Sequence, residues 1–269
     1  MEVLGYIGAV IMGLSLGLIG GGGSILTVPI LVYLFSVDAV LATAYSLFIV
    51  GLTSLIGSFS HMRMGNIHWQ MAVVFGIPSI IAVFLTRAYV VPALPDPLVS
   101  IGDTAVSKSL GMLIFFALLM VAAAFSMIRT VAVPVELSAR AESGGFNYAL
   151  ILAEGAVVGA ITGLVGAGGG FLIIPALVLL AKLPMKQAVG TSLIIIAAKS
   201  LIGFTGDLKR NKIIDWHFLL VFSAIAVVGI IAGSILSKRI PNEKLKPAFG
   251  WFVLAMGVYI ISKELSNLY

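Results

Sequence analysis

The chain has 269 residues, of which 60% are hydrophobic and only 10% are charged, and its formal net charge is +5. Soluble proteins carry charge on about a quarter of their residues, so this composition excludes a soluble globular domain and indicates a protein embedded in a membrane along its whole length. The absence of cysteine excludes disulfides, thiolate metal sites and cysteine nucleophiles.

The first apolar segment is interrupted by a run of glycines. Residues 3–19 are apolar, Gly20–Gly23 follow, and residues 24–35 form a second apolar run. As helices, the two runs would be about 26 and 18 Å long, and the shorter one cannot cross a hydrocarbon core of about 30 Å. One continuous helix over both runs would be too long for a single crossing. We therefore expect a helical hairpin with the glycines at its turn.

Three longer apolar segments complete the first half. Asp38 precedes the first of them and is a favourable helix N-cap. A polar loop over His61–His68 separates the first segment from the second, and Trp69 begins the second as an interface anchor. The expected spans are residues 39–61, 69–91 and 109–128.

The second half repeats this plan. Gly20 aligns with Gly166 and Pro29 with Pro175, at an offset of 146 residues. The chain therefore divides into a first transmembrane repeat (1–128), a linker (129–147) and a second transmembrane repeat (148–269). The expected elements of the second repeat are the apolar run 148–165, the glycine break 166–170, the short run 171–181 and the spans 187–206, 216–237 and 248–262.

Each half crosses the membrane an odd number of times, whether its hairpin is re-entrant or makes two full crossings. This predicts two halves that are inverted relative to each other. The expected fold is an all-α polytopic membrane protein with two inverted repeats, each a glycine-broken helical hairpin followed by three membrane-spanning helices. Lysine and arginine gather in the loops on one side of the membrane, and the positive-inside rule makes that side cytoplasmic. Both termini lie on the opposite side, so they are expected outside the cell.

The two glycine breaks are candidates for a binding site. Broken helices persist inside a membrane only where protein or an aqueous cavity surrounds them. Paired breaks in inverted repeats are typical of secondary transporters. The short runs beginning near Ser24 and Gly170 would direct helix N-termini at the break, where an anion is favoured. The alternative is that the glycines only permit close helix packing, which fits Gly13-xxx-Gly17 and Gly159-xxx-Gly163 best.

Lys199 is the most informative single residue. It lies deep in the span 187–206, where a lysine costs about 2.5–3.5 kcal/mol to insert. Its counterpart in the first repeat is Thr53, so only one copy carries a charge. A fixed cation beside two helix N-termini suits an anionic substrate. The alternatives are that Lys199 extends to the interface or pairs with a carboxylate such as Glu154.

Several hydroxyl groups recur at matched positions, including Ser46 and Ser192. They either bind substrate oxygens or bond to their own backbone. Glu154 is an intramembrane acid that either carries a coupling proton or balances Lys199. The histidines lack metal-ligand spacing, so we expect interfacial roles for them, and neither a metal nor a cofactor is predicted. The candidate substrate-binding residues are Gly20, Gly21, Gly22, Gly23, Ser24, Ser46, Ser54, Gly166, Gly168, Gly169, Gly170, Thr191, Ser192 and Lys199.

At these motifs the sequence resembles the TauE/SafE family of membrane transporters, also described as sulfite exporters. The resemblance lies in the doubled glycine-rich segment that ends at Pro29 and Pro175, and in the blocks Ser54–Gly57 and Ser200–Gly203. It implies a multi-pass protein of the cell inner membrane that moves sulfite or small organosulfonates, often outward. The second copy departs from the all-glycine run at Ala167.

The leading hypothesis is therefore a secondary transporter of a small sulfur-containing anion, energised by an ion gradient with the proton as the expected coupling ion. A transporter of another anion or of a cation is the first alternative, and a membrane-embedded enzyme or assembly factor is the second. Because no nucleophile–base pair or zinc motif is evident, we expect no enzymatic activity and no nucleic-acid partner. A monomer and a homo-oligomer both stay open.

Overall fold

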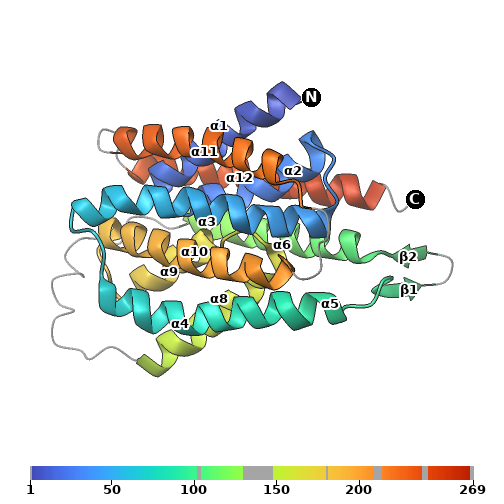
Figure 1. Cartoon of the computed structure of the whole chain (residues 1–269), viewed down its shortest axis with the longest axis horizontal. Helices are drawn as coiled ribbons and strands as arrows, with labels where there is room; N and C mark the ends of the chain where they lie inside the picture. Colours follow the sequence, from blue (N-terminus) through green and yellow to red (C-terminus); the bar gives the residue numbers. More distant parts are fainter. Residues whose placement is uncertain are drawn as a thin grey trace.

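The computed structural model describes residues 2–101, 104–129, 148–179, 181–208, 214–237 and 242–266. Its long helices lie side by side in one bundle, with the start of α1 and the end of α12 at the same end (Figure 1). Within the described part, seven helices are long and apolar enough to cross a membrane. The chain therefore has the structure of a polytopic membrane protein, as its composition predicted.

The first half contains α1 (Glu2–Ile19), the 3-10 helix η1 (Gly22–Leu26), α2 (Thr27–Leu34), α3 (Ala39–Arg63), α4 (Trp69–Leu85), the π-helical turn η2 (Thr86–Val90), α5 (Val91–Ala93), β1 (Val99–Ile101), β2 (Thr104–Val106) and α6 (Lys108–Arg129). The second half contains α8 (Tyr148–Val165), α9 (Gly170–Leu179), α10 (Met185–Leu208), α11 (Trp216–Leu236) and α12 (Asn242–Ser266). The predicted linker 129–147 lies outside the described residues, except for Arg129.

Local signals located several helix starts correctly. The Asp38 carboxylate accepts hydrogen bonds from the backbone N–H groups of Val40 and Leu41, at 2.9 and 3.2 Å, and so caps α3. The helices α4 and α11 begin at Trp69 and Trp216, as expected. Both indole rings are exposed at the bundle surface, which fits the predicted role as interface anchors.

The all-α expectation missed a small hairpin. Strands β1 and β2 pair antiparallel, with Val99 opposite Val106 and Ile101 opposite Thr104. These four residues are β-branched, and β-branched side chains favour extended backbone. The segment follows α5 and precedes α6, so it lies outside the candidate spans.

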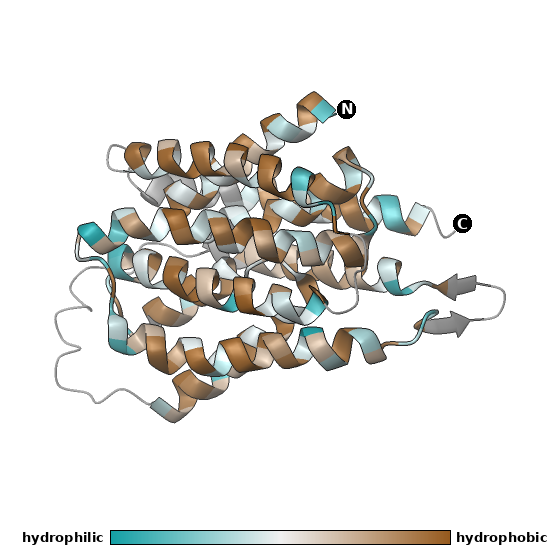
Figure 2. Ribbon diagram, in the orientation of Figure 1, coloured by the Kyte–Doolittle hydropathy of each residue, from teal (hydrophilic) through white to brown (hydrophobic). Residues whose placement is uncertain are grey.

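Two helix ends extend further than predicted. The helix α3 runs to Arg63, so His61 lies inside its last turn and is buried rather than interfacial. The helix α10 runs to Leu208, so Asp207, the first residue after the expected span 187–206, is part of the helix and buried rather than in the loop that would follow. Polar residues therefore enter the bundle near its ends, although Figure 2 shows that hydrophobic residues dominate the middle of the helices.

Glycines hold two parallel helix pairs in close contact. A Cβ atom on Gly13 of α1 would lie 2.0 Å from the carbonyl oxygen of Ala226 in α11, and one on Gly159 of α8 would lie 2.4 Å from that of Ser79 in α4. Only a hydrogen atom fits at such distances. The close-packing interpretation is therefore right for Gly13 and Gly159.

The central pair of helices, α3 and α10, runs antiparallel. A Cβ on Gly51 would contact Leu201 at 2.8 Å, and a Cβ on Gly203 would contact Leu47 at 3.5 Å. Gly51 lies two residues before Thr53, and Leu201 lies two residues after Lys199. Because the helices run in opposite directions, Thr53 and Lys199 lie at about the same level of the bundle.

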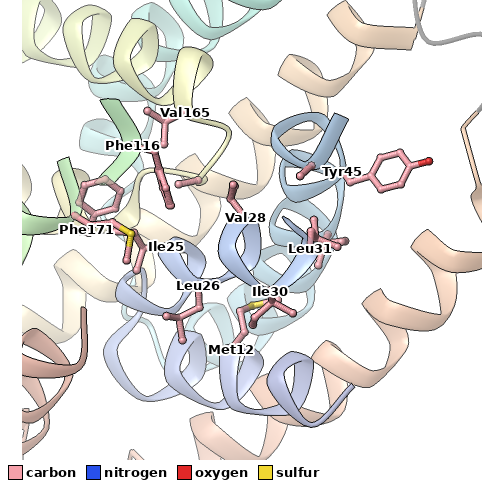
Figure 3. Packing of buried hydrophobic residues seen from close by; sticks show 14 of the residues in the cluster. Met12, Ile25, Leu26, Val28, Ile30, Leu31, Tyr45, Phe116, Val165 and Phe171 are labelled. Carbon is pink, nitrogen blue, oxygen red and sulfur yellow. The ribbon is translucent and has the colours of Figure 1, made fainter. Parts of the chain in front are cut away.

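The broken segments lie in the interior of the bundle. Ile25 of η1 and Phe171 of α9 belong to one buried apolar cluster with Phe116 of α6 and Val165 of α8 (Figure 3). These side chains shield both breaks from lipid. This satisfies the requirement that an interrupted helix at membrane depth is enclosed by protein.

We predict that Gly13→Ala and Gly159→Ala each lower the free energy of unfolding by about 1–3 kcal/mol or more, because the new methyl group forces a packed helix pair apart. The midpoint of thermal unfolding in detergent measures this effect. Gly76→Ala in α4 is the matched control, because its Cβ would meet only Ile195 at 3.8 Å. Equal stability of all three variants would contradict the packing argument.

Candidate functional site

The two glycine breaks lie directly against each other. A Cβ on Gly170 would lie 2.2 Å from the Cα atom of Gly21, and a Cβ on Gly21 would lie 2.5 Å from the Cα atom of Gly170. The two segments, distant in sequence, therefore touch backbone to backbone. Side chains at these two positions would separate them.

The two breaks have different backbone conformations. In the second break, Gly166, Gly168 and Gly169 have φ angles of 73, 65 and 73°, a left-handed region that favours glycine. The helix α9 then begins at once, at Gly170. In the first break, only Gly20 has a positive φ, of 84°, and the 3-10 helix η1 follows. The expected inequality of the two breaks is therefore present in the backbone itself.

Each break begins against a central helix of the opposite half. A Cβ on Gly20 would lie 2.3 Å from Val189 Cγ1 in α10, and a Cβ on Gly166 would lie 2.3 Å from the Thr43 carbonyl oxygen in α3. Thr43 and Val189 occupy matched positions of the two repeats. The two breaks therefore pack against corresponding positions of α10 and α3. The residue at that position is the apolar Val189 for the first break and the polar Thr43 for the second.

Lys199 contacts the second break. Its side chain is fully buried, and Nζ donates a hydrogen bond of 2.7 Å to the hydroxyl of Thr162 in α8. The same Nζ would lie 2.7 Å from a Cβ on Gly169. The hydroxyl of Thr162 donates in turn to the carbonyl oxygen of Gly159 at 3.2 Å. Lys199 therefore does not extend to the interface, and its ammonium group is held beside the break.

Glu154 is not the partner that the structure gives to Lys199. The hydrogen bond of Lys199 goes to Thr162, and no ion pair joins Lys199 to Glu154 among the described residues. Glu154 is half-buried, and its Oε2 atom is buried without a hydrogen bond within the described part of the chain. The charge-balance alternative for Glu154 therefore has no support from a direct contact.

Three of the predicted hydroxyl ligands already form hydrogen bonds within the protein. Ser24 donates to the carbonyl oxygen of Gly21 at 2.8 Å, and Ser192 donates to that of Val189 at 2.8 Å. The hydroxyl of Thr191 accepts from the backbone N–H of His68 at 2.9 Å. Ser24 and Ser192 therefore bond to nearby backbone, as buried hydroxyls commonly do, whereas Thr191 joins α10 to the residue that precedes α4.

The hydroxyls of Ser46 and Ser54, by contrast, form no hydrogen bond among the described residues. Both side chains are fully buried in α3, and neither oxygen has a hydrogen-bond partner in the part of the chain that the structure describes. Ser200, the counterpart of Ser54 beside Lys199, has the same property. Buried polar groups are normally hydrogen-bonded, so these three hydroxyls are open to a ligand or an ordered water.

Sequence reasoning missed Arg87, which lies near the end of the expected span 69–91. Arg87 lies in the π turn η2, and its side chain is fully buried. Its Nη1 donates to the Thr43 hydroxyl at 3.0 Å, and its Nε lies 3.6 Å from Oδ2 of Asp207. One available signal was its position at the end of a long apolar run that begins at Trp69.

The comparisons with known proteins address the whole chain. A family model described as "Sulfite exporter TauE/SafE" matches residues 6–260. The chain belongs to the TauE/SafE family. A "Probable membrane transporter protein" of Xylella fastidiosa strain Temecula1 is 30% identical over 96% of this chain and 94% of its own length. A relative from Methanocaldococcus jannaschii with the same description is 29% identical over 88% and 86%. No solved structure gives a significant match.

This TauE/SafE family member is therefore a membrane transporter with several spanning helices, as its sequence motifs predicted. The family resemblance rested on the doubled glycine segments, and those segments form the contact at the centre of the bundle. Its predicted binding residues fall into two groups. In the first group, Ser46 and Ser54 have buried hydroxyls without a hydrogen bond among the described residues, and Lys199 lies beside the second break. In the second group, Ser24, Thr191 and Ser192 form hydrogen bonds with backbone groups.

We predict that Thr162→Val lowers the free energy of unfolding by about 1.5–3 kcal/mol, because it removes the hydrogen-bond partner of a buried ammonium group. The matched control is Thr53→Val, whose hydroxyl donates only to the carbonyl oxygen of Ile49 in its own helix at 2.6 Å. Thermal unfolding in detergent distinguishes the two. Addition of Lys199→Met should restore most of the lost stability of Thr162→Val, and equal losses for both threonine variants would refute the prediction.

Proposed function

We propose that this transporter is a secondary-active exporter of small sulfur-containing anions, sulfite or organosulfonates, and that it works by alternating access in the cell inner membrane. One observation carries the proposal. The buried ammonium group of Lys199 lies beside Gly169, at the level where the two broken segments meet. An intramembrane cation at such a position marks a substrate pathway.

Two sources of positive potential converge on the second break. Lys199 supplies a full charge, and the helix α9 begins at Gly170 beside it. The first N–H groups of a helix have no intrahelical acceptor, and the helix dipole adds a partial positive charge there. An oxyanion would receive hydrogen bonds from both sources. We therefore propose that the breaks and Lys199 bind the substrate, with Ser46 and Ser54 as further donors.

Replacement of the Thr162 hydroxyl by a substrate oxygen would strengthen the bond of Lys199. The reason is that an anion adds charge attraction to the ammonium group, which the neutral Thr162 hydroxyl does not supply. In the described structure Gly21 and Gly170 are in contact, so this state is closed at the centre. Substrate binding then requires η1 and α9 to separate, which is the conformational step of the proposed cycle.

The helix contacts support two inverted repeats. The pair of α1 with α11 corresponds to the pair of α8 with α4, and both pairs run parallel. The matched helices α3 and α10 pack against each other in opposite directions. A two-fold axis in the membrane plane produces this pattern, because it reverses a helix that it maps onto its partner. We propose that residues 1–128 and 148–269 are these repeats and that their alternation provides access to each side.

We further propose that transport draws on an ion gradient and that the chain has no enzymatic activity or resident cofactor. Glu154 is the proposed carrier of a coupling proton. Its Oε2 atom is buried without a hydrogen bond among the described residues, and intramembrane acids commonly take part in proton relays. A proton gradient would then drive the anion outward.

We predict that Lys199→Met abolishes flux of radiolabelled sulfite or small organosulfonates into proteoliposomes, because the anion loses the charge beside Gly169. Lys186→Met is the matched control, since Lys186 lies exposed in the first turn of the same helix. A pH gradient should accelerate flux, and Glu154→Gln should remove that acceleration.

Unchanged flux in a folded Lys199→Met variant would refute the central site. Competition identifies the substrate class: unlabelled organosulfonates should reduce sulfite flux. Competition by a cation instead would favour a site built from backbone carbonyl groups. No flux of any anion with normal folding would favour the assembly-factor alternative.

A further inference from the structure

Arg87 brings a second positive charge into the interior. Its side chain is fully buried in the π turn η2 between α4 and α5. π turns within α-helices are frequent at functional sites. An arginine inside a spanning segment is costly and faces a partner or a pathway. The question is whether Asp207 alone accounts for it.

One nitrogen of the guanidinium group is held in place by α3. Nη1 donates to the Thr43 hydroxyl at 3.0 Å, and that hydroxyl donates to the carbonyl oxygen of Val40 at 2.7 Å. The helix α10 packs against the other side, because a Cβ on Gly206 would lie 3.0 Å from the Cβ of Arg87. The guanidinium group is therefore held by Thr43 of α3, and the base of the side chain packs against α10.

The remaining edge of the guanidinium group has unused hydrogen-bond donors. Nε and Nη2 are both buried, and neither forms a hydrogen bond within the described residues. Oδ2 of Asp207 lies 3.6 Å from Nε, close enough for an ion pair but beyond hydrogen-bond distance. The N–H groups of Nε and Nη2 point the same way. They match two oxygens of one carboxylate, sulfonate or phosphate group.

The Nε–Nη2 edge of Arg87 lies close to the second break. Thr43, which orients Arg87, packs against Gly166, and Lys199 contacts Gly169. These two glycines are three residues apart, so their Cα atoms are separated by at most about 11 Å. Arg87 and Lys199 therefore lie near the start and the end of one glycine segment. Asp207 in the last turn of α10 places Arg87 toward one end of the bundle.

We infer that Arg87 forms a second oxyanion site, separate from Lys199, in which two oxygens of a sulfonate, sulfite or carboxylate group accept hydrogen bonds from Nε and Nη2. Asp207 competes with the anion for the guanidinium group and balances its charge when the site is empty. The site lies where an anion enters or leaves the central site at Lys199. It is an inference beyond the proposed function, because binding at Arg87 does not require transport.

Isothermal titration of the purified full chain with methanesulfonate tests this inference. All variants carry Lys199→Met, so that the central ammonium group is absent. The Lys199→Met protein without further changes should still bind methanesulfonate at one site, the one at Arg87. Addition of Asp207→Asn should tighten binding by about tenfold, because the competing carboxylate is removed. Addition of Arg87→Gln together with Asp207→Asn should abolish binding, and it removes both charges of the ion pair together.

Two further variants test the geometry of the site. Arg87→Lys keeps the charge but lacks the planar pair of donors, so binding should weaken by at least about tenfold. Arg63→Gln is the matched control, since Arg63 is exposed in the last turn of α3, and it should bind as the background does. Equal binding with and without Arg87→Gln in the Asp207→Asn background would overturn the inference, and so would an absence of binding to the Lys199→Met background. Both results are independent of the flux measurements.

Discussion

The direct contact between the backbones of Gly21 and Gly170 determines how the interior is arranged. With a Cβ at Gly170 only 2.2 Å from the opposite Cα atom, the two segments approach too closely for a side chain to fit between them. This approach brings η1 and α9 to the centre of the bundle. It thereby places Gly169 within reach of Lys199 and Gly166 against Thr43. The buried charge of Lys199 thus lies beside the place where the two broken segments meet.

Local chemistry predicted the framework well. Asp38 as an N-cap, Trp69 as an anchor and the glycine breaks each depend on a few neighbouring residues, and each lies where the pattern indicated. The burial of Lys199 was predictable from the long apolar run around it. Its partner Thr162 was not predictable, because that contact depends on where α8 crosses α10, and the aligned position of the first repeat carries Leu16.

Arg87 shows the limit of reasoning from span length. Near the end of an apolar run, an arginine is expected to reach water at the interface. In the fold, Gly206 allows α10 to lie against it and Thr43 binds its Nη1, so that water is excluded. Neither contact is local in sequence. The same long-range packing draws Asp207 out of its expected loop and into the interior.

The parallel helix pairs have a mechanical consequence. Glycines let α1 pack against the backbone of α11, and α8 against that of α4. The first helix of each proposed repeat therefore packs against a helix of the other repeat. In the proposed arrangement, a single repeat is therefore not the unit that moves as a rigid body. Relative motion has to pass between these mixed pairs and the central helices α3 and α10. In the proposed transport cycle, we therefore expect the hinge where these pairs contact α3 and α10.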